Sequence, residues 1–129
     1  MDRISDFLTI IRNANHAHKE TCSAPYSKIN RHIAEIMKSE GFIRNIDEGK
    51  DEKGHKTIVI IMKYVGENSA INSIQRWSKP GRRLYYQHSE IPRVMGGLGL
   101  GIMTTSKGIL KDRDARRQKV GGEMICTLW

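Results

Sequence analysis

Three hydroxyl side chains stand in a row before a lysine and a glycine, in the segment Thr104-Thr105-Ser106-Lys107-Gly108. Hydroxyl groups both donate and accept hydrogen bonds, so a loop of them can meet ribose 2′-OH groups, phosphates and base edges of an irregularly folded RNA. Gly108 would let the backbone approach such a surface closely. The same segment could instead be an ordinary threonine-rich strand end that runs into a turn. Both interpretations stay open on these residues alone.

Basic side chains follow this segment at helical spacing. Arg113, Arg116 and Arg117 lie at i, i+3 and i+4, so on a helix they share one face that could follow a phosphate backbone. Asp112 and Asp114 favour the start of such a helix through capping and dipole interactions, and they partly neutralise it. A solvated helix face is therefore the alternative to a phosphate contact.

A basic turn followed by two tyrosines forms a third candidate, in residues 78–86. Cations beside aromatic rings are the surroundings on which unpaired bases stack. If this stretch is a strand, Tyr85 and Tyr86 point to opposite faces of the sheet, so one ring is free to stack while the other packs inward. We favour Tyr85 as the exposed ring.

Net charge agrees with a polyanion as the partner. The 129 residues carry 22 Lys and Arg against 14 Asp and Glu, a formal charge of +8. Residues 1–66 hold eleven basic and nine acidic side chains (11 − 9 = +2), and residues 67–129 hold eleven and five (11 − 5 = +6). The excess lies in the second half, and it favours nucleic acid as the ligand there.

Enzymatic chemistry finds little support in the sequence. The glycines of residues 97–101 are spaced G-x-G-x-G rather than G-x-G-x-x-G, and Ser106-Lys107-Gly108 inverts the order of a phosphate-binding loop. The five histidines are scattered, and Cys22 and Cys126 belong to no CxxC motif, so neither a metal site nor a catalytic triad is indicated. We expect no catalytic residues, no cofactor and no metal, and two buried, reduced thiols in a cytoplasmic protein.

No apolar run approaches the roughly 18 residues of a membrane helix, and no export signal opens the chain. We therefore expect a protein that is neither exported nor inserted in a membrane.

The first half reads as a small α/β unit. Asp2 can cap a helix with an apolar stripe at Ile4, Phe7, Leu8 and Ile11, and Ser27 can cap a second helix that Gly41 ends. Strands are expected at residues 21–24, 42–46 and 57–64, with the charged residues 47–56 as the connection between the last two. The predicted order is helix, strand, helix, strand, strand.

The second half reads as mostly β, with a domain boundary between residues 66 and 67. Residues 71–77 fit a strand or a helix by periodicity, and the turn required at residues 79–82 favours a strand. Further strands are expected at residues 84–86, 102–104, 109–110 and 124–129, a short helix at 112–119 and a turn at Gly121-Gly122. The fold class is thus α+β, with two small α/β domains, 1–66 and 67–129.

Taken together, several segments resemble the family of bacterial small-subunit ribosomal protein eight. They cover nearly the whole chain in the family's order: residues 6–14, 40–43, 79–85, 91–99, 104–108, 112–116 and 121–126.

The resemblance implies a structural constituent of the small ribosomal subunit, with no enzymatic activity. A protein of this family binds the central domain of 16S rRNA at an irregular helix early in assembly and helps to assemble the platform. The resemblance also implies ribosomal proteins five and twelve as neighbours, a monomer within the subunit, location in the cytoplasmic ribosome, and possible autogenous translational repression. A nucleotide-dependent enzyme that uses the glycine-rich loop and a protein that chiefly represses its own messenger are the alternatives.

Site residues follow from the resemblance position by position. Most of them lie in the second domain, and two lie in the first: Thr104, Thr105, Ser106, Lys107, Gly122, Glu123 and Tyr85, with Ser27 and Lys28. Arg113 and Arg116 join them through the basic segment. The family commonly has serine where Thr104 stands, and the added methyl restricts the hydroxyl's rotamers. Glu123 would be repelled by phosphate, so it is expected to accept from base amino groups or from a backbone amide that shapes the loop.

Overall fold

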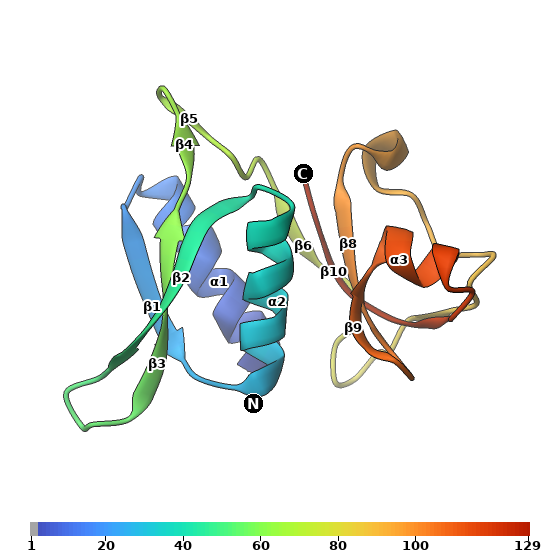
Figure 1. Ribbon diagram of the computed structural model, residues 1–129, viewed down its shortest axis with the longest axis horizontal. Helices are drawn as coiled ribbons and strands as arrows, with labels where there is room; N and C mark the ends of the chain where they lie inside the picture. Colours follow the sequence, from blue (N-terminus) through green and yellow to red (C-terminus); the bar gives the residue numbers. More distant parts are fainter. Residues whose placement is uncertain (1–2) are drawn as a thin grey trace. The chain divides into compact units, whose positions relative to one another are not determined.

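The computed structural model describes residues 3–129, which form two compact units, Arg3–Asn72 and Ser73–Trp129. Each unit combines helices with an antiparallel sheet (Figure 1), which confirms the predicted α+β class. The predicted helix cap at Asp2 lies outside the described residues.

The first unit places two helices on one face of a three-stranded sheet (Figure 1). Strand β3 lies between β1 and β2, and both pairings are antiparallel. A small hairpin, β4–β5, follows the sheet. The elements are α1 (Arg3–His16), β1 (Thr21–Pro25), α2 (Lys28–Ser39), β2 (Ile43–Lys50), β3 (Lys56–Met62), β4 (Tyr64–Val65) and β5 (Asn68–Ser69).

Apolar periodicity explains how these elements pack. Phe7, Leu8 and Ile11 of α1 are all buried, as their helical spacing predicts. Along β3, buried residues alternate with partly exposed ones from Ile58 to Met62, as expected for a strand with one face on the core. The core of the first unit therefore lies between the helices and the sheet.

Polar caps set the bounds of α2. The Ser27 side chain accepts a hydrogen bond from the Asn30 amide at 3.1 Å, which confirms the predicted N-cap. At the other end Gly41 has φ +82°, the left-handed conformation that commonly ends a helix. Both predicted ends of this helix are confirmed.

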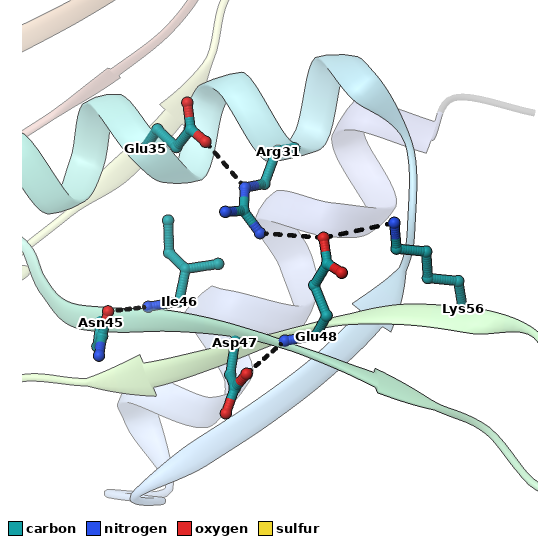
Figure 2. Close-up of polar contacts among 7 residues, drawn as sticks. All are labelled: Arg31, Glu35, Asn45, Ile46, Asp47, Glu48 and Lys56. Carbon is teal, nitrogen blue, oxygen red and sulfur yellow. Dashed lines mark hydrogen bonds and ion pairs between the residues drawn. The ribbon is translucent and has the colours of Figure 1, made fainter.

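Strand β2 is longer than the sequence predicted, because residues 47–50 belong to it rather than to the connecting loop. This strand is an edge of the sheet, and its polar side chains can point to solvent while the backbone pairs with β3. Glu48 also lies 3.4 Å from both Arg31 Nη1 and Lys56 Nζ (Figure 2). Arg31 in turn donates to Glu35 at 2.9 Å, so the charges that suggested a loop are paired across the sheet and α2.

The division between the units lies at residues 72 and 73, later in the chain than the predicted 66/67 boundary. The Asn15 side-chain amide of α1 donates to the Ile71 carbonyl at 2.9 Å and also bonds the Ser69 hydroxyl, which holds the β5 segment to the first unit. Ser73 instead pairs with Trp129 through two backbone hydrogen bonds of 2.9 and 3.1 Å. Contacts far apart in sequence thus decide where the first unit ends.

The second unit is built around strand β10, which pairs with three other strands: β6, β7 and β8. Helix α3 packs beside β8 and β9. The elements are β6 (Ile74–Arg76), β7 (Tyr85–Tyr86), the short 3-10 helix η1 (Val94–Gly97), β8 (Leu100–Thr105), β9 (Gly108–Lys111), α3 (Asp112–Arg117) and β10 (Gly122–Leu128).

Three predicted bounds in this unit are wrong in an informative way. Gly122 opens β10 instead of lying in a turn. Leu100 and Gly101, placed in the glycine-rich loop, already belong to β8. Helix α3 stops at Arg117 because Lys119 turns into the left-handed region, at φ +56°. The sheet thus extends into segments whose glycines suggested loops.

One core cluster of the second unit gathers residues of β8, α3 and β10. Met103, Ala115 and Met124 are fully buried in it, and Ile91 is nearly so. Trp77, Tyr86, Leu110 and Val120 pack against them. The Trp77 indole nitrogen donates to the Thr127 hydroxyl at 2.9 Å, which satisfies a polar group that packing would otherwise leave unpaired.

Both cysteines are free thiols whose pKa is raised by burial. Desolvation raises the pKa of Cys126 from 9.0 to about 12 and that of Cys22 to about 11. Thiolate is the nucleophile in thiol modification. We therefore expect Cys126 in a Cys22→Ala variant to react with a disulfide reagent at pH 8 far more slowly in the native protein than in urea. Equal rates would contradict its burial.

The same shift has a consequence for stability. A thiol that stays protonated in the folded state stabilises that state fully below pH 9, and this contribution is lost as pH rises from 9 toward about 12. Urea unfolding at pH 8 and pH 10 should therefore show a smaller pH-dependent loss of stability for Cys126→Ala than for the parent chain.

Candidate nucleic-acid interface

The start of strand β10 brings together residues that are far apart in the sequence. Glu123 is paired with Tyr85 of β7 on one side and with Thr104 of β8 on the other. Directly opposed residues of antiparallel strands share a face of the sheet. Tyr85, Glu123 and Thr104 therefore form one row across three strands, here called the β7–β10–β8 row.

The two tyrosines of β7 have opposite environments. Tyr85 is 71% exposed. The Tyr86 ring lies 6.1 Å from the Trp77 ring in an edge-to-face contact and packs on the core. The prediction that Tyr85 is the outward ring is thus confirmed, and its contact with RNA stays a prediction.

The predicted hydroxyl loop is the turn between β8 and β9. The Thr105 hydroxyl donates to the Gly108 carbonyl at 2.9 Å and accepts from the Lys107 amide at 3.1 Å. Ser106 and Lys107 are exposed at its tip. One of the three hydroxyls therefore closes the turn, which leaves Ser106 presented outward and Thr104 on the β7–β10–β8 row.

Gly122 is required by the sheet itself. A Cβ atom built at this position would lie 2.2 Å from the Thr104 carbonyl oxygen and 3.0 Å from Thr105 Cγ2. Since real Cβ atoms do not approach a backbone oxygen so closely, any side chain here would push β10 away from β8. The glycine thereby fixes the spacing between the hydroxyl turn and β10.

Glu123 is buried, with 6% of its surface exposed. Its carboxylate accepts from Arg83 at 3.0 Å. Arg83, from the loop before β7, is the partner that the structure gives Glu123, and the contact with a base amino group or a backbone amide stays a prediction. The carboxylate thus holds Arg83 beside Tyr85, and the positive charge of Arg83 offsets the negative charge that would repel phosphate.

Ser78 closes the loop before β7, a structural role that the sequence did not reveal. It is fully buried, and its hydroxyl accepts from the Leu84 amide at 2.9 Å. Lys79 and Arg82 exchange two backbone hydrogen bonds inside the loop that Ser78 closes. The loop delivers Arg83 and Tyr85 to the sheet. The sequence signal for this loop closure was a small polar residue directly before Lys-Pro-Gly.

The arginines of α3 do not act as one face. Asp112 is 1% exposed, and it accepts from Arg116 at 2.7 Å and from the Gly101 amide at 3.1 Å. Arg116 is thus held inside the unit, with 16% of its side chain exposed. Arg113 is exposed, and Arg117 is 75% exposed while it pairs with Asp114. Arg116 therefore supports the helix more than it offers a phosphate contact.

In the first unit, Ser27 and Lys28 open α2. The Ser27 hydroxyl is engaged as the helix cap, whereas Lys28 is exposed. The lysine is thus the more available of the two for an external phosphate.

Gly99 of the glycine-rich segment is required by packing. A Cβ at Gly99 would lie 2.4 Å from Val94 Cγ1 and 2.9 Å from the Leu128 carbonyl oxygen. This glycine allows close contact between β8, η1 and β10. The alternative of a nucleotide-binding loop gains no support from this geometry.

Within residues 3–129, no group of three or more His, Cys, Asp or Glu side chains is placed to hold a metal ion. No helix in this range is long and apolar enough to cross a membrane.

Fold and surface together define a small basic α+β protein with hydroxyl, aromatic and cationic groups held at one end of a sheet. A profile of the family described as Ribosomal protein S8 matches residues 2–129, and the chain belongs to this family.

Similar proteins bear this out over nearly full length. The chain is 52% identical over 128 residues to the small ribosomal subunit protein uS8 of Opitutus terrae, covering 99% of this chain and 98% of that protein. It is 50% identical over 129 residues to the uS8 of Sorangium cellulosum, with 99% and 98% covered. Against the uS8 of Syntrophus aciditrophicus the identity is 46% over 129 residues, with 99% and 97% covered.

Replacing Gly122 should disturb the interface and the fold together. Gly122→Ala places a methyl group against the Thr104 carbonyl, and we expect it to lower the free energy of unfolding by about 1–3 kcal/mol, as overpacking does. Urea unfolding measures the change. Gly81→Ala is the control, because Gly81 has no atom within 4 Å of its Cβ position and, like Gly122, lies outside the left-handed region. A Gly122→Ala protein more stable than this control would contradict the close approach.

Removing the Asp112 carboxylate should destabilise the second unit. Asp112→Ala leaves Arg116 without its partner and the Gly101 amide unbonded, and breaking a buried pair in this way costs about 3 kcal/mol or more. Chemical denaturation measures the loss, with Asp114→Ala as the control on the same helix, because the Asp114 side chain is 32% exposed. Equal effects of the two changes would show that the Asp112 contacts do not stabilise the fold.

Proposed function

We propose that this protein is a structural, non-enzymatic constituent of the small ribosomal subunit and that it binds the central domain of 16S rRNA. Family membership supports the ribosomal role. The β7–β10–β8 row together with the β8–β9 turn is the observation that carries the RNA contact. An exposed aromatic ring, outward hydroxyls and cations lie there at one end of the sheet, where an unpaired base can stack and ribose groups can be recognised.

Selectivity and attraction come from different residues. Ser106 and Thr104 supply neutral hydrogen-bonding groups, which distinguish a folded RNA by where its 2′-OH groups and base edges lie. Lys107, Arg113 and Arg117 are exposed cations that add salt-dependent attraction to phosphates. Arg116 contributes by supporting α3, and Gly122 and Glu123 by fixing the row and Arg83. Lys28 extends the contact to the first unit, with Ser27 holding the start of its helix.

The cellular setting follows from the same proposal. The protein acts as a monomer within the small subunit of the cytoplasmic ribosome, helps to assemble the platform, and has ribosomal proteins five and twelve as neighbours. A messenger that presents the same RNA shape would occupy the same surface, which makes autogenous repression a second use of it. The family resemblance supports these points.

The Ser106 hydroxyl provides the sharpest test of this function. If it makes a buried hydrogen bond to RNA, Ser106→Ala should weaken binding to a transcript of the 16S central domain by about 1–3 kcal/mol, because the RNA partner is left unpaired. A filter-binding titration measures the dissociation constant. Ser89→Ala is the matched control, an exposed serine of another turn in the same unit. Unchanged affinity for both variants would contradict the assignment of the hydroxyl turn.

A further inference from the structure

A cavity of about 490 Å³ lies in the first unit, and none of its lining residues belongs to the β7–β10–β8 row or to the β8–β9 turn. The apolar part of its wall is formed by Phe7 of α1, Pro25 at the end of β1, and Tyr26. Asn30 of α2 also lines the cavity. This volume falls within the range of about 300–1,000 Å³ that is typical of ligand pockets. The cavity can therefore hold a planar group of moderate size.

Asn30 places a hydrogen-bond acceptor beside this cavity. The residue is 3% exposed, and its side-chain oxygen Oδ1 is buried without a hydrogen-bond partner among residues 3–129. It stands three residues after the Ser27 cap, where a longer Glu or Gln side chain would reach back to the cap amide. A buried, unpaired acceptor costs folding free energy. A ligand that donates an N–H to Asn30 would remove that cost.

The charges around the cavity favour a ligand with a single negative charge. Arg3, His55 and Lys56 contribute cationic or potentially cationic groups, and Asp6 contributes one carboxylate. The Lys56 ammonium lies 4.2 Å from the Tyr26 ring centroid and 3.4 Å from Glu48. Because the two acids offset part of the positive charge, the rim suits one phosphodiester better than a triphosphate.

We propose that this cavity receives one unstacked nucleotide of the bound RNA, whose base donates to Asn30 Oδ1 while its phosphate meets Arg3 and Lys56. A base supplies both the flat apolar body for the Phe7, Pro25 and Tyr26 wall and the N–H donors that Asn30 lacks. This inference rests on the proposed RNA-binding function. It adds a nucleotide-sized subsite in the first unit.

The test compares Asn30→Leu with Asn13→Leu in the full chain. Leucine nearly preserves the volume but cannot accept a hydrogen bond, so Asn30→Leu should keep or raise the melting temperature. Its dissociation constant for the 16S central-domain transcript should rise about 5- to 100-fold. Asn13 is an exposed residue of α1 outside this cavity, and its replacement should leave the affinity unchanged. Ultraviolet crosslinking of the parent complex, read by mass spectrometry, should join a nucleotide to Phe7 or Tyr26.

The possible outcomes separate this inference from the proposed function. If the parent chain binds the transcript and Asn30→Leu binds it equally well, the subsite is excluded while RNA binding stands. If crosslinks form in the second unit but none at Phe7 or Tyr26, the subsite is likewise overturned, even where Asn30→Leu fails to fold. Saturable binding of free AMP, GMP, CMP or UMP with unaltered RNA affinity in Asn30→Leu would assign the cavity to a soluble nucleotide. Failure of the parent chain to bind the transcript would overturn the proposed function as well.

Discussion

The pairing of strand β10 with β7 and β8 is the constraint on which the candidate interface depends. Residues 85, 104 and 123 are brought into one row by this pairing alone, since each comes from a different stretch of the chain. The absence of a side chain at Gly122 sets how closely β10 approaches the Thr104 carbonyl. A shift of one residue in this register would move each side chain to the opposite face of the sheet and turn Tyr85 toward the core.

Internal polar contacts decide which residues remain available for a partner. Asp112 engages Arg116, Glu123 engages Arg83, and the Thr105 hydroxyl closes its own turn. These groups hold the scaffold, so the groups free to be selective are fewer and mostly neutral. Net positive charge brings a polyanion close, but it places no particular base or ribose. A preorganised sheet end with outward hydroxyls and one exposed ring can do so at low entropic cost, because the protein groups are already fixed.

Local patterns in the sequence were sufficient for much of the fold. The α1 stripe, the Ser27 cap and the outward Tyr85 follow from spacing and from single-residue chemistry, and all three are confirmed. Residues 47–50 were misplaced because polar composition suggests a loop, whereas an edge strand with paired charges tolerates it. Gly122 was assigned to a turn because its real requirement, the Thr104 carbonyl of another strand, is a tertiary contact that no local pattern encodes.

The sequence predicted which residues belong to the candidate site better than it predicted the role of each residue. Arginine spacing placed Arg116 on a shared helix face, but only the tertiary structure brings Asp112 into the interior, where it pairs with that arginine. Ser78 and Arg83 belong to the predicted basic turn, but their individual roles were not predictable, because these roles come from a loop closure and from a contact with Glu123, which lies 40 residues away. The buried acceptor of Asn30 is likewise visible only after packing.

Hydrogen exchange of the full chain, measured by mass spectrometry with and without the 16S central-domain transcript, tests the central claim most directly. Binding through the β7–β10–β8 row and the β8–β9 turn predicts slowed amide exchange in peptides that cover residues 104–108 and 84–86. A complex that forms with unchanged exchange in both of these segments would contradict the account.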